Sequence, residues 1–225
     1  FLNAYNDIHS RGRLPVLCRE TGMYIEAVLK GYKLINVPPD MELRKDLEKR
    51  NHDELKELLF SYASNLHNTT DLTSKKRTLR AIEIAKYYAE HPQEEMDYPQ
   101  INPLILGVKF DRPTQRKRIT ERLKSRLSEG MVDEVRRLMD AGVTRDDLMY
   151  YGLEYKFLAL YLSGELSYDE MVQRLNTSIH QFAKRQMTYF RKMQKNGLQI
   201  HWLDGHATME EKLQRTNKII AGFNE

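Results

Sequence analysis

The stretch that decides the fold class is "LPVLCRETGMYIEAVLKG", residues 14–31. Residues 14–18 have the apolar composition of a short buried strand, a tight turn follows, and residues 22–30 have the apolar spacing of a helix. A strand that leads through a turn into a helix is a building unit of α/β proteins, and its turn often binds phosphate. Arg19 and Glu20 stand where such a turn would carry glycines. The stretch predicts an α/β protein and leaves open whether its turn meets a phosphate.

Two further candidate strands lie far along the chain, at 103–110 ("PLILGVKF") and 198–203 ("LQIHWL"). Each is short and apolar and is flanked by Gly or Pro, as buried parallel strands tend to be. Most other segments have helical periodicity. One helix is predicted to open near Asp40, after two prolines, and another to run from a Thr/Ser cap at 73–74 to a stop before Pro92. A helix over 51–64 has a predicted apolar face made of Leu55, Leu58, Leu59 and Tyr62.

These elements predict a predominantly helical α/β fold with few parallel strands. Residues 1–32 and 100–225 form its predicted core, and residues 33–99 form a helical insert that ends in a linker.

The composition is that of a globular protein with enough apolar material for a core, because 40% of its 225 residues are hydrophobic and 30% are charged. No apolar run approaches the ~20 residues that a membrane span needs, so we expect no membrane partner. Cys18 is the single cysteine, which excludes an internal disulfide and fits a reducing, cytoplasmic location. The chain starts at Phe1, without methionine and inside a helical pattern, so we expect a further segment upstream.

The net charge of +4 proves no partner by itself, but the positive charge is concentrated in two segments. Residues 111–126 carry seven basic and two acidic residues. At a spacing of i, i+4 and i+8, one face of the predicted helix carries Arg118, Arg122 and Arg126. Such a row suits phosphates. A solvated face with Glu121 and Glu129 as partial partners remains the alternative.

The second basic segment, 171–203, carries six basic residues and no acid. Its basic residues alternate with Phe182, Tyr189 and Phe190. Cations take RNA phosphates, and flat rings stack on unpaired bases. The alternative is an amphipathic helix whose aromatic residues belong to the core. A smaller cluster opens the helix after Ser74 and consists of Lys75, Lys76, Arg77 and Arg80. Cations at a helix N-terminus oppose the macrodipole, so an external anion is a reasonable explanation.

Several motifs are absent. The sequence has no G-x-x-x-x-G-K-[ST] phosphate loop and no G-x-G-x-x-G. No set of His, Cys, Asp and Glu has metal-ligand spacing, so no metal ligand is assigned.

Five segments in order carry a resemblance to a known family: "LPVLCRETGMYIEAVLKG", "KKRTLRAIEI", "DRPTQRKRITERL…EGMVDEVRRLMDAG", "YKFLALYLSGELSYDEM" and "QFAKRQMTYFRKM…IHWLD". They resemble the tRNA dimethylallyltransferases, also called tRNA isopentenyltransferases. The similarity covers nearly the whole chain.

The resemblance implies a P-loop-kinase-like α/β core and a helical insert that grips the tRNA anticodon stem-loop. It implies a prenyltransferase that moves a dimethylallyl group from dimethylallyl diphosphate to N6 of adenosine 37, with Mg²⁺ as cofactor. The base must leave its stack to expose the amine, and cations stabilise the departing pyrophosphate. The resemblance leads us to expect a cytoplasmic, monomeric tRNA-modifying enzyme.

The resemblance also implies roles for particular residues. On the diphosphate side it places Thr21, Gly22, Arg112 and Arg118. On the tRNA side it places Lys76, Arg77, Arg80, Tyr155, Lys156, Lys184, Arg185, Gln186, Thr188, Tyr189 and Arg191. The family's phosphate loop and its catalytic Asp, the general base, are expected upstream of Phe1, so no catalytic residue is assigned.

The sequence departs from the family pattern at several of these places. Arg19 and Glu20 replace the two glycines of the family's G-G-T-G turn. Glu154 replaces the glycine of I-G-Y-K, His180 replaces an arginine, and Tyr189 replaces a tryptophan.

Three functions remain open at this point. The chain is part of a tRNA dimethylallyltransferase, or a catalytically inactive truncated relative that only binds anticodon stem-loops, or a helical protein-interaction domain. The related adenylate isopentenyltransferases use a free nucleotide, and the basic, aromatic helix near the C-terminus favours tRNA over that substrate.

Overall fold

The computed structural model describes residues 1–19, 21–32, 36–62, 72–91 and 98–223. Their contacts divide the chain into two units, Phe1–Lys30 with Ile101–Glu225, and Gly31–Gln100. The predicted insert, 33–99, falls within the second unit. No helix in the described ranges is long and apolar enough to span a bilayer.

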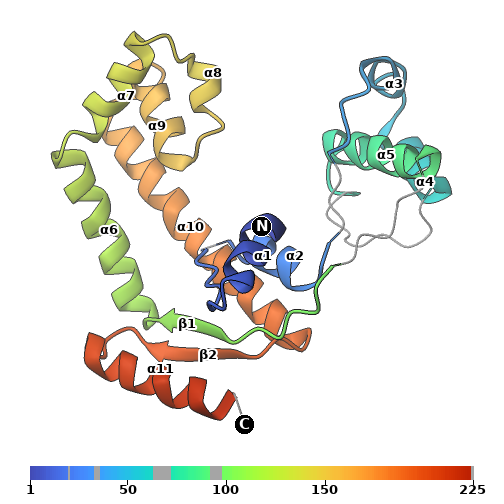
Figure 1. Cartoon of the computed structure of the whole chain (residues 1–225). Helices are drawn as coiled ribbons and strands as arrows, with labels where there is room; N and C mark the ends of the chain where they lie inside the picture. Colours follow the sequence, from blue (N-terminus) through green and yellow to red (C-terminus); the bar gives the residue numbers. More distant parts are fainter. Residues whose placement is uncertain (20, 33–35, 63–71, 92–97, 224–225) are drawn as a thin grey trace. The chain divides into compact units, whose positions relative to one another are not determined.

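The first unit holds two strands and most of the helices, labelled in Figure 1. The strands are β1, Ile105–Lys109, and β2, Ile200–Asp204. The helices are α1 (Leu2–Ser10), α2 (Gly22–Leu29), α6 (Arg112–Ser128), α7 (Met131–Asp140), α8 (Arg145–Leu148), α9 (Leu153–Leu162), α10 (Tyr168–Lys195) and α11 (Met209–Phe223).

Strands β1 and β2 pair in parallel, with Ile105 opposite Ile200. Gly107 lies opposite Trp202. A Cβ on Gly107 would lie 2.6 Å from Cζ3 of the indole, so the absence of a side chain at Gly107 makes room for the Trp202 ring. The two later strand predictions and the parallel, predominantly helical α/β fold are confirmed.

The strand predicted at 14–18 is wrong, because this segment has no regular structure. The side chains of Leu14 and Val16 are 80% and 81% exposed. An apolar run becomes a strand only where a neighbouring strand pairs with its backbone. Within the described part of the chain no strand pairs with 14–18.

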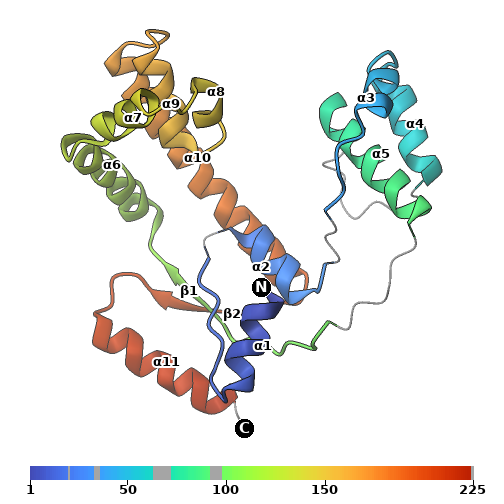
Figure 2. The same cartoon turned by 45° about the horizontal axis from the view of Figure 1, so that its top comes forward.

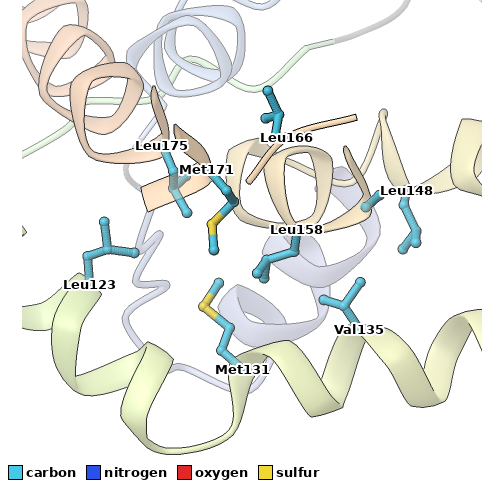
Figure 3. Packing of buried hydrophobic residues seen from close by; sticks show 9 residues of the cluster. Leu123, Met131, Val135, Leu148, Leu158, Leu166, Met171 and Leu175 are labelled. Carbon is cyan, nitrogen blue, oxygen red and sulfur yellow. The ribbon is translucent and has the colours of Figure 1, made fainter. Parts of the chain in front are cut away.

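The core of the first unit lies where α6, α7, α9 and α10 meet. Leu158 of α9, Val135 of α7 and Met171 of α10 are completely buried. Figure 3 shows Met131 and Val135 pointing from α7 toward Leu158, with Met171 above Met131. The long helix α10 begins at a capping box in which the Ser167 hydroxyl accepts from the Glu170 backbone. It continues out of this core to reach α2, so α6 and α2 both pack on it (Figure 2).

The second unit consists of α3 (Met41–Leu47), α4 (His52–Tyr62) and α5 (Lys75–Glu90). As predicted, the carboxylate of Asp40 caps α3 and the hydroxyl of Ser74 caps α5. Helices α3, α4 and α5 pack through a small core of Leu47, Leu55, Leu59, Leu79 and Ile82. Tyr62, predicted on the apolar face, is 43% exposed and is not among the residues packed in this core.

Candidate nucleic-acid interface

Helix α10 presents one continuous basic face. Successive residues of an α-helix are about 100° apart around the axis, so six side chains of its C-terminal half fall within an arc of about 120°. All six are exposed: Lys184, Arg185, Thr188, Arg191, Lys192 and Lys195. In the described structure, Lys184, Arg185 and Arg191 form no ion pair. The face therefore keeps its positive charge available for an external polyanion.

Two residues predicted to contact tRNA lie off this face. The Tyr189 hydroxyl donates a hydrogen bond to Oε2 of Glu26 at 2.5 Å, and Gln186 is half-buried on the same side of α10 as Met193. Four of the six predicted contacts on α10 thus share one exposed surface, whereas Gln186 and Tyr189 pack inward.

Gly22 at the start of α2 packs closely against α10. Thr21 is the N-cap of α2, but its hydroxyl does not cap the helix. Gly22 is buried, and a Cβ there would lie 2.5 Å from Cδ1 of Tyr189. The guanidinium of Arg19 lies 5.3 Å above the Tyr24 ring, and Glu20 falls outside the described residues. Close packing against α10 therefore explains Gly22, and the diphosphate role of Thr21 and Gly22 stays a prediction.

Glu26 is a buried acid that the sequence reasoning missed. It is 2% exposed and accepts hydrogen bonds from Tyr189 and from Nζ of Lys30, the latter at 2.8 Å. Burial acts to raise the pKa of this carboxyl, but the bonds from Lys30 and Tyr189 outweigh it and hold the pKa below its usual value. An acid inside the apolar run "GMYIEAVL" was the available signal.

The carboxyl ends of both strands meet the start of α6. Asp111, which caps α6 at the Thr114 amide, also contacts Nε2 of His206 at 2.7 Å. The bonds from the backbone and hydroxyl of Thr114, and then His206, lower the pKa of Asp111 to about 2. The guanidinium of Arg118 lies 4.6 Å above the ring of Phe110. Ligands of open α/β sheets bind at such strand ends, so the location of the exposed residues Arg112 and Arg118 suits an anionic ligand.

A partly buried polar contact joins α6 to α10. The Thr120 hydroxyl donates its proton to Oδ1 of Asn176 and also lies 3.1 Å from Nε2 of His180. Because that hydroxyl has a single proton, Nε2 of His180 must donate and Nδ1 carries the lone pair. Within the described ranges Nδ1 is buried without a hydrogen-bond partner. Burial and the nearby charge of Arg116 lower the pKa of His180.

This location predicts a pH-dependent stability. The pKa of His180 is lower in the folded chain than in the unfolded one, where it is about 6.5. Its contribution is therefore fully present above pH ~6.5 and is lost as the pH falls through the folded pKa. In urea titrations at pH 7 and pH 5, we expect His180→Gln to lose less stability on acidification than the wild type. Equal losses would contradict a neutral His180 ring held in its contact with Thr120.

The basic cluster at the start of α5 is largely occupied within the second unit. Nζ of Lys75 donates to the Glu48 carbonyl at 2.6 Å, and Arg77 donates to the Thr73 hydroxyl. Arg80 donates to Glu83 at 2.9 Å and to the Val37 carbonyl at 2.7 Å. These hydrogen bonds explain how the cations are accommodated at the N-terminus of α5 without an external anion. Among the residues that the structure describes, Lys76 is the cation of this cluster with no such partner.

Helix α9 also uses a predicted tRNA residue internally. The Tyr155 hydroxyl donates to Oε1 of Glu134 at 2.8 Å, and this bond raises the pKa of Tyr155. Nζ of Lys156 lies 5.7 Å from the centre of the Phe157 ring. Tyr150 and Tyr151, just before α9, are 85% and 70% exposed.

The described residues contain no group of three or more His, Cys, Asp or Glu side chains that fits a metal ion. Mg²⁺ prefers carboxylate and phosphate oxygens, and Asp111 is already held by Thr114 and His206. The described residues therefore do not form a magnesium site by themselves, and Mg²⁺ stays an expectation.

Comparisons with known proteins agree with the resemblance in the sequence. The model of the IPP transferase family matches residues 1–193. The chain is 56% identical over 223 residues to tRNA dimethylallyltransferase 2 of Bacteroides fragilis, covering 99% of this chain and 72% of that protein. It is 52% identical to tRNA dimethylallyltransferase 1 of Parabacteroides distasonis, over 98% of this chain and 71% of the relative.

Solved structures give the same result. The crystal structure of full-length tRNA isopentenylpyrophosphate transferase from Bacillus halodurans matches with a TM-score of 0.64 and 28% identity, over 98% of this chain and 70% of that one. The Staphylococcus epidermidis tRNA delta(2)-isopentenylpyrophosphate transferase matches with a TM-score of 0.62 and 26% identity, over 98% and 73%. The chain belongs to the IPP transferase family.

Proposed function

We propose that this protein takes part in transferring a dimethylallyl group from dimethylallyl diphosphate to N6 of adenosine 37 in tRNA. The observation that carries the proposal is the acid-free basic face of α10, in a chain that is 56% identical to a tRNA dimethylallyltransferase. The proposal makes the tRNA anticodon stem-loop and dimethylallyl diphosphate the partners and the cytoplasm the location.

In this reaction the adenine N6 forms a bond to C1 of the dimethylallyl group while the C1–O bond to diphosphate breaks. The amine loses one proton, and pyrophosphate leaves with the bonding electron pair. The chemistry therefore needs cations where negative charge develops and a firm hold on the RNA.

The proposal gives two parts of this work to residues of the chain. Arg112 and Arg118, near the strand ends, bind the diphosphate. Lys184, Arg185 and Arg191 bind RNA phosphates and set the register of the stem-loop. The general base is not assigned to any residue of the chain.

Arg185 provides a direct test of the RNA part. An exposed arginine that neutralises one phosphate contributes affinity for every RNA sequence and one unit of salt dependence. We expect Arg185→Ala to weaken binding of a labelled anticodon stem-loop and to reduce the slope of log K against log salt by about 1. Fluorescence anisotropy at several salt concentrations measures both quantities.

Arg215→Ala, which removes an exposed arginine from α11 in the same unit, is the matched control and is expected to leave both quantities unchanged. If Arg185→Ala has no effect on either quantity, α10 is not the RNA surface.

The catalytic part is tested with labelled dimethylallyl diphosphate, Mg²⁺ and unmodified tRNA that carries adenosine 37. Transfer by the chain supports the full proposal. Binding of the tRNA without transfer supports the alternative, a relative that only holds the anticodon stem-loop.

A further inference from the structure

Glu26 has a property that the basic face of α10 leaves unexplained. Its side chain is 3% exposed in the short helix α2, where a charged residue has little access to water. A buried carboxylate is costly unless other groups hydrogen-bond to it. Glu26 is therefore kept in place by what it contacts.

Its two hydrogen-bond partners differ in kind. Lys30 lies on the next turn after Glu26, so this ion pair forms within one segment of chain. Tyr189 lies 163 residues away on α10 and donates its hydroxyl proton to Oε2 at 2.5 Å. Lys192, one turn further along α10, also lowers the pKa of Glu26 by its charge. Glu26 therefore links α2 to the helix that carries the basic face.

The position of Tyr189 on α10 means that this hydrogen bond restricts how α10 can rotate about its axis. Its ring fills the space beside Gly22, so the ring has little freedom to move. Arg185 lies one turn before Tyr189 and next to it on the helix surface. His180 lies nine residues before Tyr189, about two and a half turns, so the two side chains leave α10 on opposite sides. The hydrogen bonds of His180 to α6 and of Tyr189 to α2 together fix the rotation of α10 about its own axis.

We propose that Glu26 is a positioning residue for RNA binding, which acts by holding the Tyr189 hydroxyl and so fixing the rotation of the basic face of α10. This inference rests on the proposed function, because it assumes that α10 binds RNA. The Tyr189 hydroxyl serves the protein in this arrangement and does not contact a base. Glu26 itself touches neither substrate.

The test is a double-mutant cycle in RNA affinity, measured by anisotropy with a labelled anticodon stem-loop on variants shown to be folded by circular dichroism. Tyr189→Phe keeps the ring and removes the hydroxyl, and we expect it to weaken binding about three- to tenfold. Glu26→Leu is expected to weaken binding by a similar factor. The double variant is expected to bind no more weakly than the weaker single variant, because both changes break the same bond.

Glu26→Gln keeps an oxygen that accepts from the phenol, and we expect its affinity to lie within about twofold of the wild type. This variant also keeps the test decisive if Glu26→Leu does not fold. In that case Tyr189→Phe is expected to show the weaker RNA binding, and Glu26→Gln is expected to keep the wild-type RNA affinity. Tyr161→Phe in α9 controls for the loss of a tyrosine hydroxyl. Val135→Ala, a buried change in α7, controls for lost stability and is expected to lower the melting temperature without changing the RNA affinity.

Two outcomes overturn the inference. Tyr189→Phe that binds RNA as tightly as the wild type, while Arg185→Ala binds more weakly, shows that α10 binds RNA without needing the bond. Weaker binding in Tyr189→Phe but not in Glu26→Leu shows that the hydroxyl contacts RNA itself. An unchanged Arg185→Ala would instead show that the proposed RNA surface is wrong.

Discussion

Replacing Glu83 by alanine is expected to destabilise the second unit by about 3 kcal/mol, because it leaves two arginines without their shared buried partner. The Glu83 side chain is 1% exposed and accepts from Nε of Arg44 at 2.6 Å and from Nη1 of Arg80 at 2.9 Å. It also accepts from the Asp40 amide at 3.0 Å, so one carboxylate joins the start of α3 to the middle of α5. Both arginines are partly exposed, which keeps the expected loss at the lower end of the range for broken buried pairs.

The same carboxylate predicts the direction of a pH effect. Burial raises the pKa of Glu83, but the bonds from Arg44, Arg80 and the Asp40 amide outweigh it and lower the pKa. Its stabilising contribution is therefore present above the unfolded pKa and is lost as the pH falls through the folded one. In Glu83→Ala this contribution is absent at every pH, so the stability of the variant is expected to fall less on acidification than that of the wild type.

Hydrogen exchange of the α3 and α5 amides, followed by mass spectrometry, measures the effect where it is expected. Fluorescence of Trp202, the single tryptophan, reports on the first unit instead. Asp46→Ala is the matched control, because this exposed acid of α3 has cations only at 3.8 and 3.9 Å, and we expect a change below about 0.5 kcal/mol. Unchanged exchange in Glu83→Ala would contradict the role of the buried carboxylate.

Replacing Gly22 by alanine is expected to cost about 2 kcal/mol, by overpacking the contact between α2 and α10. The new Cβ would lie 2.5 Å from Cδ1 of Tyr189 and 3.2 Å from Cε1 of Phe190. The Tyr189 ring cannot move aside freely, because Glu26 holds its hydroxyl. Helix α10 must shift relative to α2 instead. Because this shift would change the orientation of the basic face of α10, we also expect the RNA affinity to fall about tenfold.

Gly222→Ala separates this clash from a general effect of the substitution. Gly222 lies in the last turn of α11 with nothing within 4 Å of the added Cβ, so alanine there is expected to leave stability unchanged or raised by less than about 0.5 kcal/mol. Urea unfolding followed by Trp202 fluorescence measures both variants. A Gly22→Ala protein as stable as the wild type would mean that the contact between α2 and α10 is looser than described.

The helix starts and stops were predictable because their signals lie within a few residues of each other. Asp40 and Ser74 cap α3 and α5 as expected, and α5 ends before Pro92. The basic face of α10 was equally local, since helical spacing alone brings Lys184, Arg185 and Arg191 together. The apolar runs of β1 and β2 were local signals as well, and the structure adds that these two strands pair with each other in parallel.

The roles of several cations and aromatics were not predictable in this way. Arg80 reads as a free cation in the sequence, yet its partners include the Val37 carbonyl 43 residues away. Tyr155 bonds to Glu134 over 21 residues, and Tyr189 to Glu26 over 163. Which polar group satisfies another depends on which helices pack, and no local spacing encodes that.

The sequence by itself determined the family, the helices, the apolar runs that become β1 and β2, and the location of positive charge, because each depends on residue type and short-range spacing. Only the tertiary structure decided that 14–18 is exposed rather than a strand, that Gly22 makes room for Tyr189, and that Glu26 holds α10. The physical reason is common to all three. A strand, a close contact and a buried charge each exist only through a partner that the fold brings near.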